Sequence, residues 1–144
     1  MQGGAASHKR FFKDLLDKTT ALHESIDDIQ DPAIELLLKR SCADVARAVY
    51  TLRVNGDRIA AEDLKAFDAF QQLSASKTLG GGLPDFAWTQ ASCSMSNGGL
   101  ALKSAVHVAL PAFIDSRVAS KLAAESIFKD LEDAGLFPVS ALPR

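Results

Sequence analysis

Apolar residues recur every three or four positions along most of this chain, and no segment alternates apolar and polar residues as a half-buried strand would. The clearest stripe has spacings of 4, 3, 4 and 3 and consists of Leu38, Cys42, Val45, Val49 and Leu52. Asp31 can cap the helix that carries this stripe, and Pro32 suits the first helical position, where its missing N–H is not needed. We expect this helix to end near Asn55-Gly56 and to bury the Cys42 thiol.

Two further helices are predicted before residue 83. A stripe over residues 9–28 predicts the first, and a stripe over residues 60–76 predicts another that the glycines at 80–82 terminate. A short turn of helix, with Phe86 and Trp88, should follow Leu83-Pro84-Asp85.

The last third of the chain predicts two more helices. Ser104 can cap the first of them, and Pro111 should kink or split it because proline removes a backbone hydrogen bond. Its predicted inner face consists of Val106, Leu110, Phe113 and Ile114. A final helix over residues 120–134 should be closed by Gly135. The expected fold class is therefore all-α, a small bundle or orthogonal array of five to six short helices.

The length and composition suit one globular domain. The chain has 144 residues, of which 47% are apolar and 24% charged, and this is enough to form a core. We expect a single helical domain over residues 9–137, between a disordered tail at 1–8 and a second tail at 138–144. The predicted core is centred on Leu38, Val45, Val49, Phe67, Phe70 and Phe113.

Charge and cysteine content exclude several classes of protein. Sixteen basic and 18 acidic side chains give a net charge of −2, which provides no general attraction for nucleic acid or an anionic membrane. Cys42 and Cys93 are too far apart to suggest a disulfide framework or a metal motif. Because no apolar run has the length of a signal peptide or a membrane span, we expect an intracellular protein of unspecified compartment.

Three patterns that could carry chemistry each lack a necessary part. Asp27-Asp28 resembles a metal-binding doublet, but it lies at a predicted helix end rather than on a hairpin, which favours a solvated helix end. The glycines at 80–82 follow Lys77-Thr78, the reverse of the order in a phosphate-binding loop. The histidines are too widely separated to form a zinc site, which favours surface or hydrogen-bonded roles for His8, His23 and His107. We expect neither an enzyme nor a bound metal or cofactor.

The basic residues of the middle segment allow two interpretations. Arg40, Asp44 and Arg47 lie at spacings of 4 and 3, which favours a ladder of ion pairs within one helix. The alternative is a local basic strip that contacts phosphates, which would also include Lys39, Arg53 and Arg58. Trp88 could stack on a nucleic-acid base, but a lone tryptophan near Phe86 is more typical of a core.

Several short motifs occur in a distinctive order. The first group is Leu36-Leu37-Leu38, Cys42, Tyr50-Thr51-Leu52-Arg53 and Phe67-Asp68. The second group is Trp88-Thr89-Gln90-Ala91, Gly98-Gly99-Leu100-Ala101-Leu102-Lys103-Ser104 and Ala112-Phe113. Over residues 33–115 their order and spacing resemble the region after the polymerase palm in reverse transcriptase-like proteins of non-LTR retrotransposons. Cys93-Ser94 replaces the Leu-Pro of that family, Ala101 and Lys103 replace a glycine and an arginine, and the catalytic palm has no counterpart.

This resemblance implies a non-catalytic, thumb-like helical segment that has been detached from its parent protein. Such a segment would be either a fragment or a degenerate remnant of the parent. In the parent such a segment would support the template–primer duplex. The phosphate contacts that the resemblance implies are Arg40, Arg47, Arg53 and Lys103. The alternative function is a helical protein–protein interaction module with exposed apolar surface and no nucleic-acid binding. A small-molecule enzyme is the least favoured class, because no cluster of titratable residues is evident.

The segment Gly98-Gly99-Leu100 raises the question of a ligand-binding loop. It has neither the lysine nor the preceding strand of a phosphate loop. We therefore expect a tight backbone bend that directs the helix capped by Ser104 back onto the helix that begins at Pro32.

Overall fold

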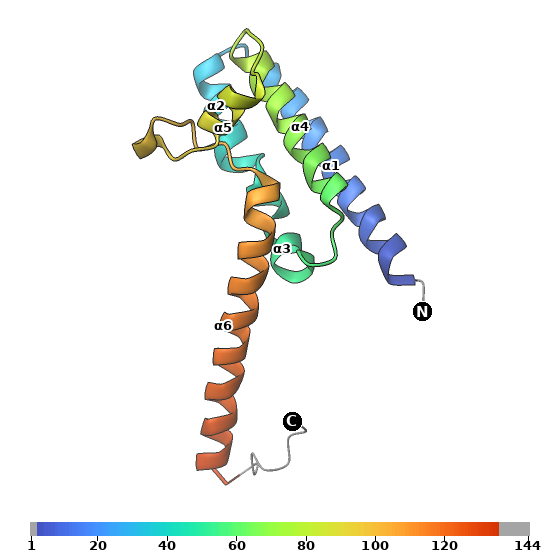
Figure 1. Cartoon of the computed structure of the whole chain (residues 1–144), viewed down its shortest axis with the longest axis vertical. Helices are drawn as coiled ribbons and strands as arrows, with labels where there is room; N and C mark the ends of the chain where they lie inside the picture. Colours follow the sequence, from blue (N-terminus) through green and yellow to red (C-terminus); the bar gives the residue numbers. More distant parts are fainter. Residues whose placement is uncertain (1–2, 136–144) are drawn as a thin grey trace.

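The chain is all-α, as predicted, and a computed structural model describes its residues 3–135. The helices are α1 (Gly3–Asp27), α2 (Pro32–Cys42), α3 (Val45–Asn55), α4 (Ala61–Thr78), α5 (Asp85–Ala91) and α6 (Ala105–Asp133), with a 3₁₀ turn, η1 (Met95–Asn97). Figure 1 shows α1 and α4 side by side, with α2 and α5 near one end of this pair. Helix α6 extends away from the packed helices α1 to α5, which we call the body. No helix in residues 3–135 is long and apolar enough to cross a membrane.

The chain ends differ in part from expectation. Helix α1 begins at Gly3 rather than near residue 9, so residues 3–8 of the predicted tail are helical. Residues 1–2 and the predicted tail at 138–144 lie outside the described residues. Gly135 follows the end of α6 with a φ of +68°, as its role in closing that helix predicts.

The long helix predicted after Pro32 is wrong, because the structure has two helices there. Asp31 caps α2 as expected, but Asp44 then starts a new helix by accepting a hydrogen bond from the Ala46 N–H at 2.7 Å. The periodic stripe therefore crosses a break that the spacing alone does not reveal. As a result, Cys42 and Val49 are exposed rather than buried.

The predicted split of the last helix is also wrong. Helix α6 runs without interruption from Ala105 to Asp133, with Pro111 exposed inside it. Its buried residues are Ala105 and Ala109, whereas three of the predicted inner residues are exposed: Val106, Leu110 and Ile114. Small side chains face the body because α3 approaches closely. A Cβ on Gly56 would lie 2.7 Å from the Ala109 carbonyl oxygen, so this glycine allows the contact.

The glycines after α4 terminate it as predicted. Gly80 has a φ of +70°, and its N–H donates to the Lys77 carbonyl at 3.1 Å. The Gly81 N–H donates to the Ser76 carbonyl at 3.2 Å. This pair of bonds is the Schellman pattern, which satisfies carbonyl groups that the helix end leaves free.

Two apolar clusters hold the body together. The first joins α1, α3, α4 and α6, and its buried members are Phe12, Val45, Ala48, Leu52, Leu64, Phe67, Ala105 and Ala109. The second is smaller and includes the half-buried Trp88, which agrees with the core interpretation of that side chain. Of the predicted core residues, Val45 and Phe67 are buried, while Leu38, Phe70 and Phe113 are half-buried.

Candidate functional site

The Gly98-Gly99 segment is a tight bend, as predicted. Gly98 has a φ of +75°, which L side chains rarely adopt. Gly99 is constrained by space instead, because a Cβ there would lie 2.1 Å from the Cys93 carbonyl oxygen. The Leu100 N–H donates to the Ala91 carbonyl at 3.0 Å and so ties the bend to the end of α5.

Asp68 joins the two groups of motifs that carried the sequence resemblance. Ser104 caps α6 by accepting from the His107 N–H at 3.3 Å. Its hydroxyl donates to the Asp68 carboxylate at 2.5 Å, and the Ala105 N–H donates to the same carboxylate at 2.6 Å. A carboxylate at a helix N-terminus is favourable, because free N–H groups and the positive end of the helix dipole face it. Asp68 of α4 therefore fixes the start of α6.

The four predicted phosphate contacts are spread over several elements. Arg40 on α2 donates to the Met95 sulfur at 2.9 Å. Arg47 and Arg53 are six residues apart on α3, so they lie about 120° apart around its axis. Lys103 is exposed just before α6 and lies near the buried carboxylate of Asp44. Phosphate binding by this set stays a prediction.

A buried polar cluster between α1, α2 and α4 was not predicted from the sequence. Lys39, whose side chain is 3% exposed, forms an ion pair with Asp27 and donates to the Thr78 hydroxyl at 2.7 Å. Thr78 in turn donates to the Glu35 carboxylate at 3.1 Å. Asp27-Asp28 does form the end of α1, and Asp28 is exposed, as predicted. The predicted solvation is wrong for Asp27, because its carboxylate is the counter-charge of a buried lysine.

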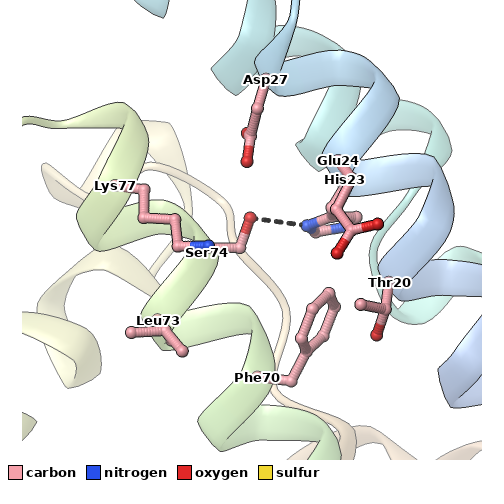
Figure 2. Close-up of a pocket in the computed structure, with 8 residues that line it drawn as sticks. All are labelled: Thr20, His23, Glu24, Asp27, Phe70, Leu73, Ser74 and Lys77. Atoms are coloured by element: carbon pink, nitrogen blue, oxygen red, sulfur yellow. Dashed lines mark hydrogen bonds between the residues drawn. The ribbon is translucent and has the colours of Figure 1, made fainter.

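His23 lies beside this cluster and bridges α1 to two other segments. Its Nε2 is 2.7 Å from the Ala43 carbonyl, which can only accept, so Nε2 carries the proton. In the neutral ring, Nδ1 then accepts from the Ser74 hydroxyl at 2.7 Å (Figure 2). His23 is a buried, hydrogen-bonded residue, one of the two roles that the sequence favoured for the histidines.

The His23–Ser74 pair has the arrangement of a base and a hydroxyl, but little space adjoins it. The pocket in Figure 2 has a volume of about 40 Å³, which is room for a few water molecules. Small-molecule sites typically have at least about 300 Å³. Among the described residues, no three His, Cys, Asp or Glu side chains gather as metal ligands. The hydrogen bonds of His23 instead join α1 to α4 and to the segment between α2 and α3.

We expect the stability of the protein to fall as the pH drops below about 6.5. Burial lowers the pKa of His23 from its usual 6.5, so the unfolded chain takes up a proton there first. The unfolding free energy then decreases with falling pH by up to about 1.4 kcal/mol per unit until the folded-state pKa is reached. Urea unfolding of the wild type and His23→Gln over a pH series measures this loss.

The pH dependence of the difference between the two proteins isolates His23. Burial raises the pKa of Asp44, whose effect has the opposite sign: its stabilising contribution is lost as the pH rises above 3.8. Asp44 is present in both proteins, so its effect cancels in the difference. Parallel pH curves for the wild type and His23→Gln would contradict this prediction.

Helix α6 carries a row of exposed apolar side chains. They recur mostly every four residues and are Val106, Leu110, Ile114, Val118, Leu122 and Ile127. Figure 1 shows the second half of α6 reaching beyond the other described helices. We call residues 118–133 the α6 stem. In the stem, Val118 is 54% exposed, Leu122 61% and Ile127 58%.

Comparison with known proteins gives no relative: no protein-family model, curated protein or solved structure matches the chain. The retrotransposon origin that the motifs imply therefore stays a prediction.

Proposed function

We propose that the protein is a helical protein–protein interaction module that binds its partner through the α6 stem. The observation that carries this proposal is the exposed apolar surface of the stem, which no other described helix covers. Val118 and Ile127 are nine residues apart, about two and a half turns, so apolar side chains face opposite sides of the stem. A helix that is apolar on several sides is usually buried.

The low stability expected of an isolated stem also favours a bound partner. The stem extends about 24 Å, and isolated helices of its length are only marginally stable in water. Burial of one large aliphatic side chain contributes about 1.5–3 kcal/mol, so a partner that covers a few of these residues would stabilise the stem.

The proposal is tested by comparing the stem with the body of the protein. We expect the backbone amides of the stem to exchange hydrogen rapidly in the monomer, whereas those of α3 and α4 are protected. At a protein concentration at which the chain is monomeric, a variant carrying Val118→Gln, Leu122→Gln and Ile127→Gln should keep the unfolding midpoint of the wild type, because these side chains serve the partner and not the core. A protected stem in the monomer, or a large fall in the midpoint, would overturn the proposal.

The sequence resemblance suggests a second candidate, a helical support for a nucleic-acid duplex. Its support is that Asp68 and Ser104, one from each motif group, are in contact and fix α6 on α4. A primer–template binding assay at low salt separates the two candidates. Duplex binding that weakens with salt and is lost when Arg47 and Arg53 become alanine would favour the second. No binding at low salt is expected for the interaction module.

A further inference from the structure

A basic pocket lies where the α6 stem leaves the body. It has a volume of about 200 Å³ between the end of α3 and the middle of α6. Its lining consists of Arg53, Val54, Ser116, Arg117 and Ser120. This lining contains two guanidinium groups and no carboxylate, so the pocket favours an anionic group.

Both arginines are available to a ligand. Within residues 3–135, Arg53 has one long ion pair, of 3.8 Å with Asp115, between side chains that are 51% and 77% exposed. Exposed pairs of this kind contribute little and exchange easily. Arg117 lies over the Phe113 ring, 5.0 Å from its centroid, which positions the guanidinium without using its N–H groups. A guanidinium binds a carboxylate with two parallel hydrogen bonds.

The far end of the stem carries the complementary charge. The last turn of α6 contains three exposed carboxylates and no basic residue: Asp130, Glu132 and Asp133. Acidic groups are unfavourable at a helix C-terminus, where the dipole is already negative. None of the ion pairs within residues 3–135 includes these three side chains. A positive group from another molecule would offset this repulsion.

We infer that the partner of the stem is a second copy of this chain, bound antiparallel, with the acidic end of each stem at the basic pocket of the other. This inference rests on the proposed function and names its partner. Arg117 and Glu132 are 15 residues, or about 22 Å, apart, too far to pair within one chain. In an antiparallel dimer with twofold symmetry, Arg117 of each copy lies opposite the partner's Glu132 at both ends of the interface at once.

The residues between these two positions fit such an interface. One side of α6 between residues 117 and 132 has spacings of 4, 3, 4 and 4 and presents Arg117, Lys121, Ala124, Phe128 and Glu132. The exposed apolar Val118 and Ile127 flank this side about 80° and 100° from its centre, and Leu122 lies about 120° from it. With Arg117 opposite Glu132, the midpoint falls between Ala124 and Glu125, where a small side chain allows close approach. Lys121, whose ammonium pairs with Glu125 of its own helix at 3.7 Å, then lies opposite the partner's Phe128, and this ring can pack on the aliphatic carbons of the lysine.

Sedimentation equilibrium of the full chain tests the inference. We expect a dimer that Arg117→Glu and Glu132→Arg each weaken by about tenfold or more. The chain that carries both substitutions should regain most of the affinity, because an antiparallel interface restores opposite charges. A parallel interface would place like charges together and would not recover. Arg58→Glu, which changes an exposed arginine outside the pocket, should leave the dimer intact.

The outcomes separate this inference from the proposed function. A monomeric chain whose stem exchanges rapidly overturns the second-copy inference and leaves the interaction module standing. A dimer that the charge reversals do not weaken, or one that the double variant does not restore, also overturns the inference. A monomeric chain with a protected stem overturns both. Dimer formation that correlates with protection of the stem, and weakens at high salt, supports both.

Discussion

Gly99→Val is expected to lower the unfolding free energy by more than about 3 kcal/mol, because the bend at Gly99 has no room for a side chain. A Cβ at this position would lie 2.1 Å from the Cys93 carbonyl oxygen and 2.6 Å from the Gln90 carbonyl oxygen. Both are backbone atoms near the end of α5, so relief requires the backbone to move. That movement would break the bonds from Leu100 and Leu102 to the Ala91 carbonyl.

Two other glycines provide matched controls for this effect. Gly98 has a φ of +75° but open space around it, so Gly98→Ala should cost only about 1 kcal/mol of backbone strain. Gly81 has open space and an ordinary φ, and Gly81→Val should change stability least. Urea unfolding followed by circular dichroism measures all three variants. Equal stability of Gly99→Val and Gly81→Val would show that the bend is not sterically constrained.

The same bend illustrates what sequence can and cannot predict. Two adjacent glycines between helical segments indicate a bend, because glycine alone combines a positive φ with close backbone approach. Which glycine serves which purpose depends on where Cys93 and Gln90 lie after folding. Local signals of this type also located the caps at Asp31 and Ser104 and the end of α4.

Two predictions were wrong because tertiary contacts override the local pattern of apolar residues. The stripe through Cys42 and Val45 has helical spacing, yet α2 ends at Cys42 and the buried carboxylate of Asp44 caps the start of a new helix. The inner face of α6 was predicted from its large side chains, whereas close packing on α3 selects Ala105 and Ala109. Hydrophobic periodicity locates large apolar side chains. Two helices that pack closely need small residues where they touch.

No sequence signal predicted the buried polar cluster, and only one arginine of the basic pocket was predicted. Lys39 and Asp27 are 12 residues apart, and Lys39 and Thr78 are 39 apart, so only the packing of three helices brings them together. Arg53 was predicted as an anion contact, but its neighbour in the pocket, Arg117, is 64 positions away and was not predicted. Charged residues that are far apart in the sequence come together only through the packing of the helices, which a single sequence does not specify.

Lys39→Met should lower the unfolding free energy by about 3–5 kcal/mol, because it removes one partner of a buried ion pair. Methionine fills a similar volume, so the cost reports charge and hydrogen bonding rather than a cavity. The substitution leaves Asp27 without its ion-pair partner, and it takes a donor from the Thr78 hydroxyl, which itself donates to the buried Glu35. Denaturant unfolding at pH 7 measures the change.

Lys18→Met is the matched control, because Lys18 pairs with Asp14 at 2.8 Å on the surface of α1 with 65% and 57% of the side chains exposed. An exposed pair one turn apart contributes about 0.5 kcal/mol or less, so this variant should be almost as stable as the wild type.

The second control adds Glu35→Gln. In the wild type Glu35→Gln removes a charge that Lys39 balances, and it should destabilise the protein. In the Lys39→Met background it removes an unbalanced buried charge, so it should restore part of the lost stability. A Glu35→Gln effect of the same sign and size in both backgrounds would mean that Lys39 and Glu35 are not coupled through Thr78.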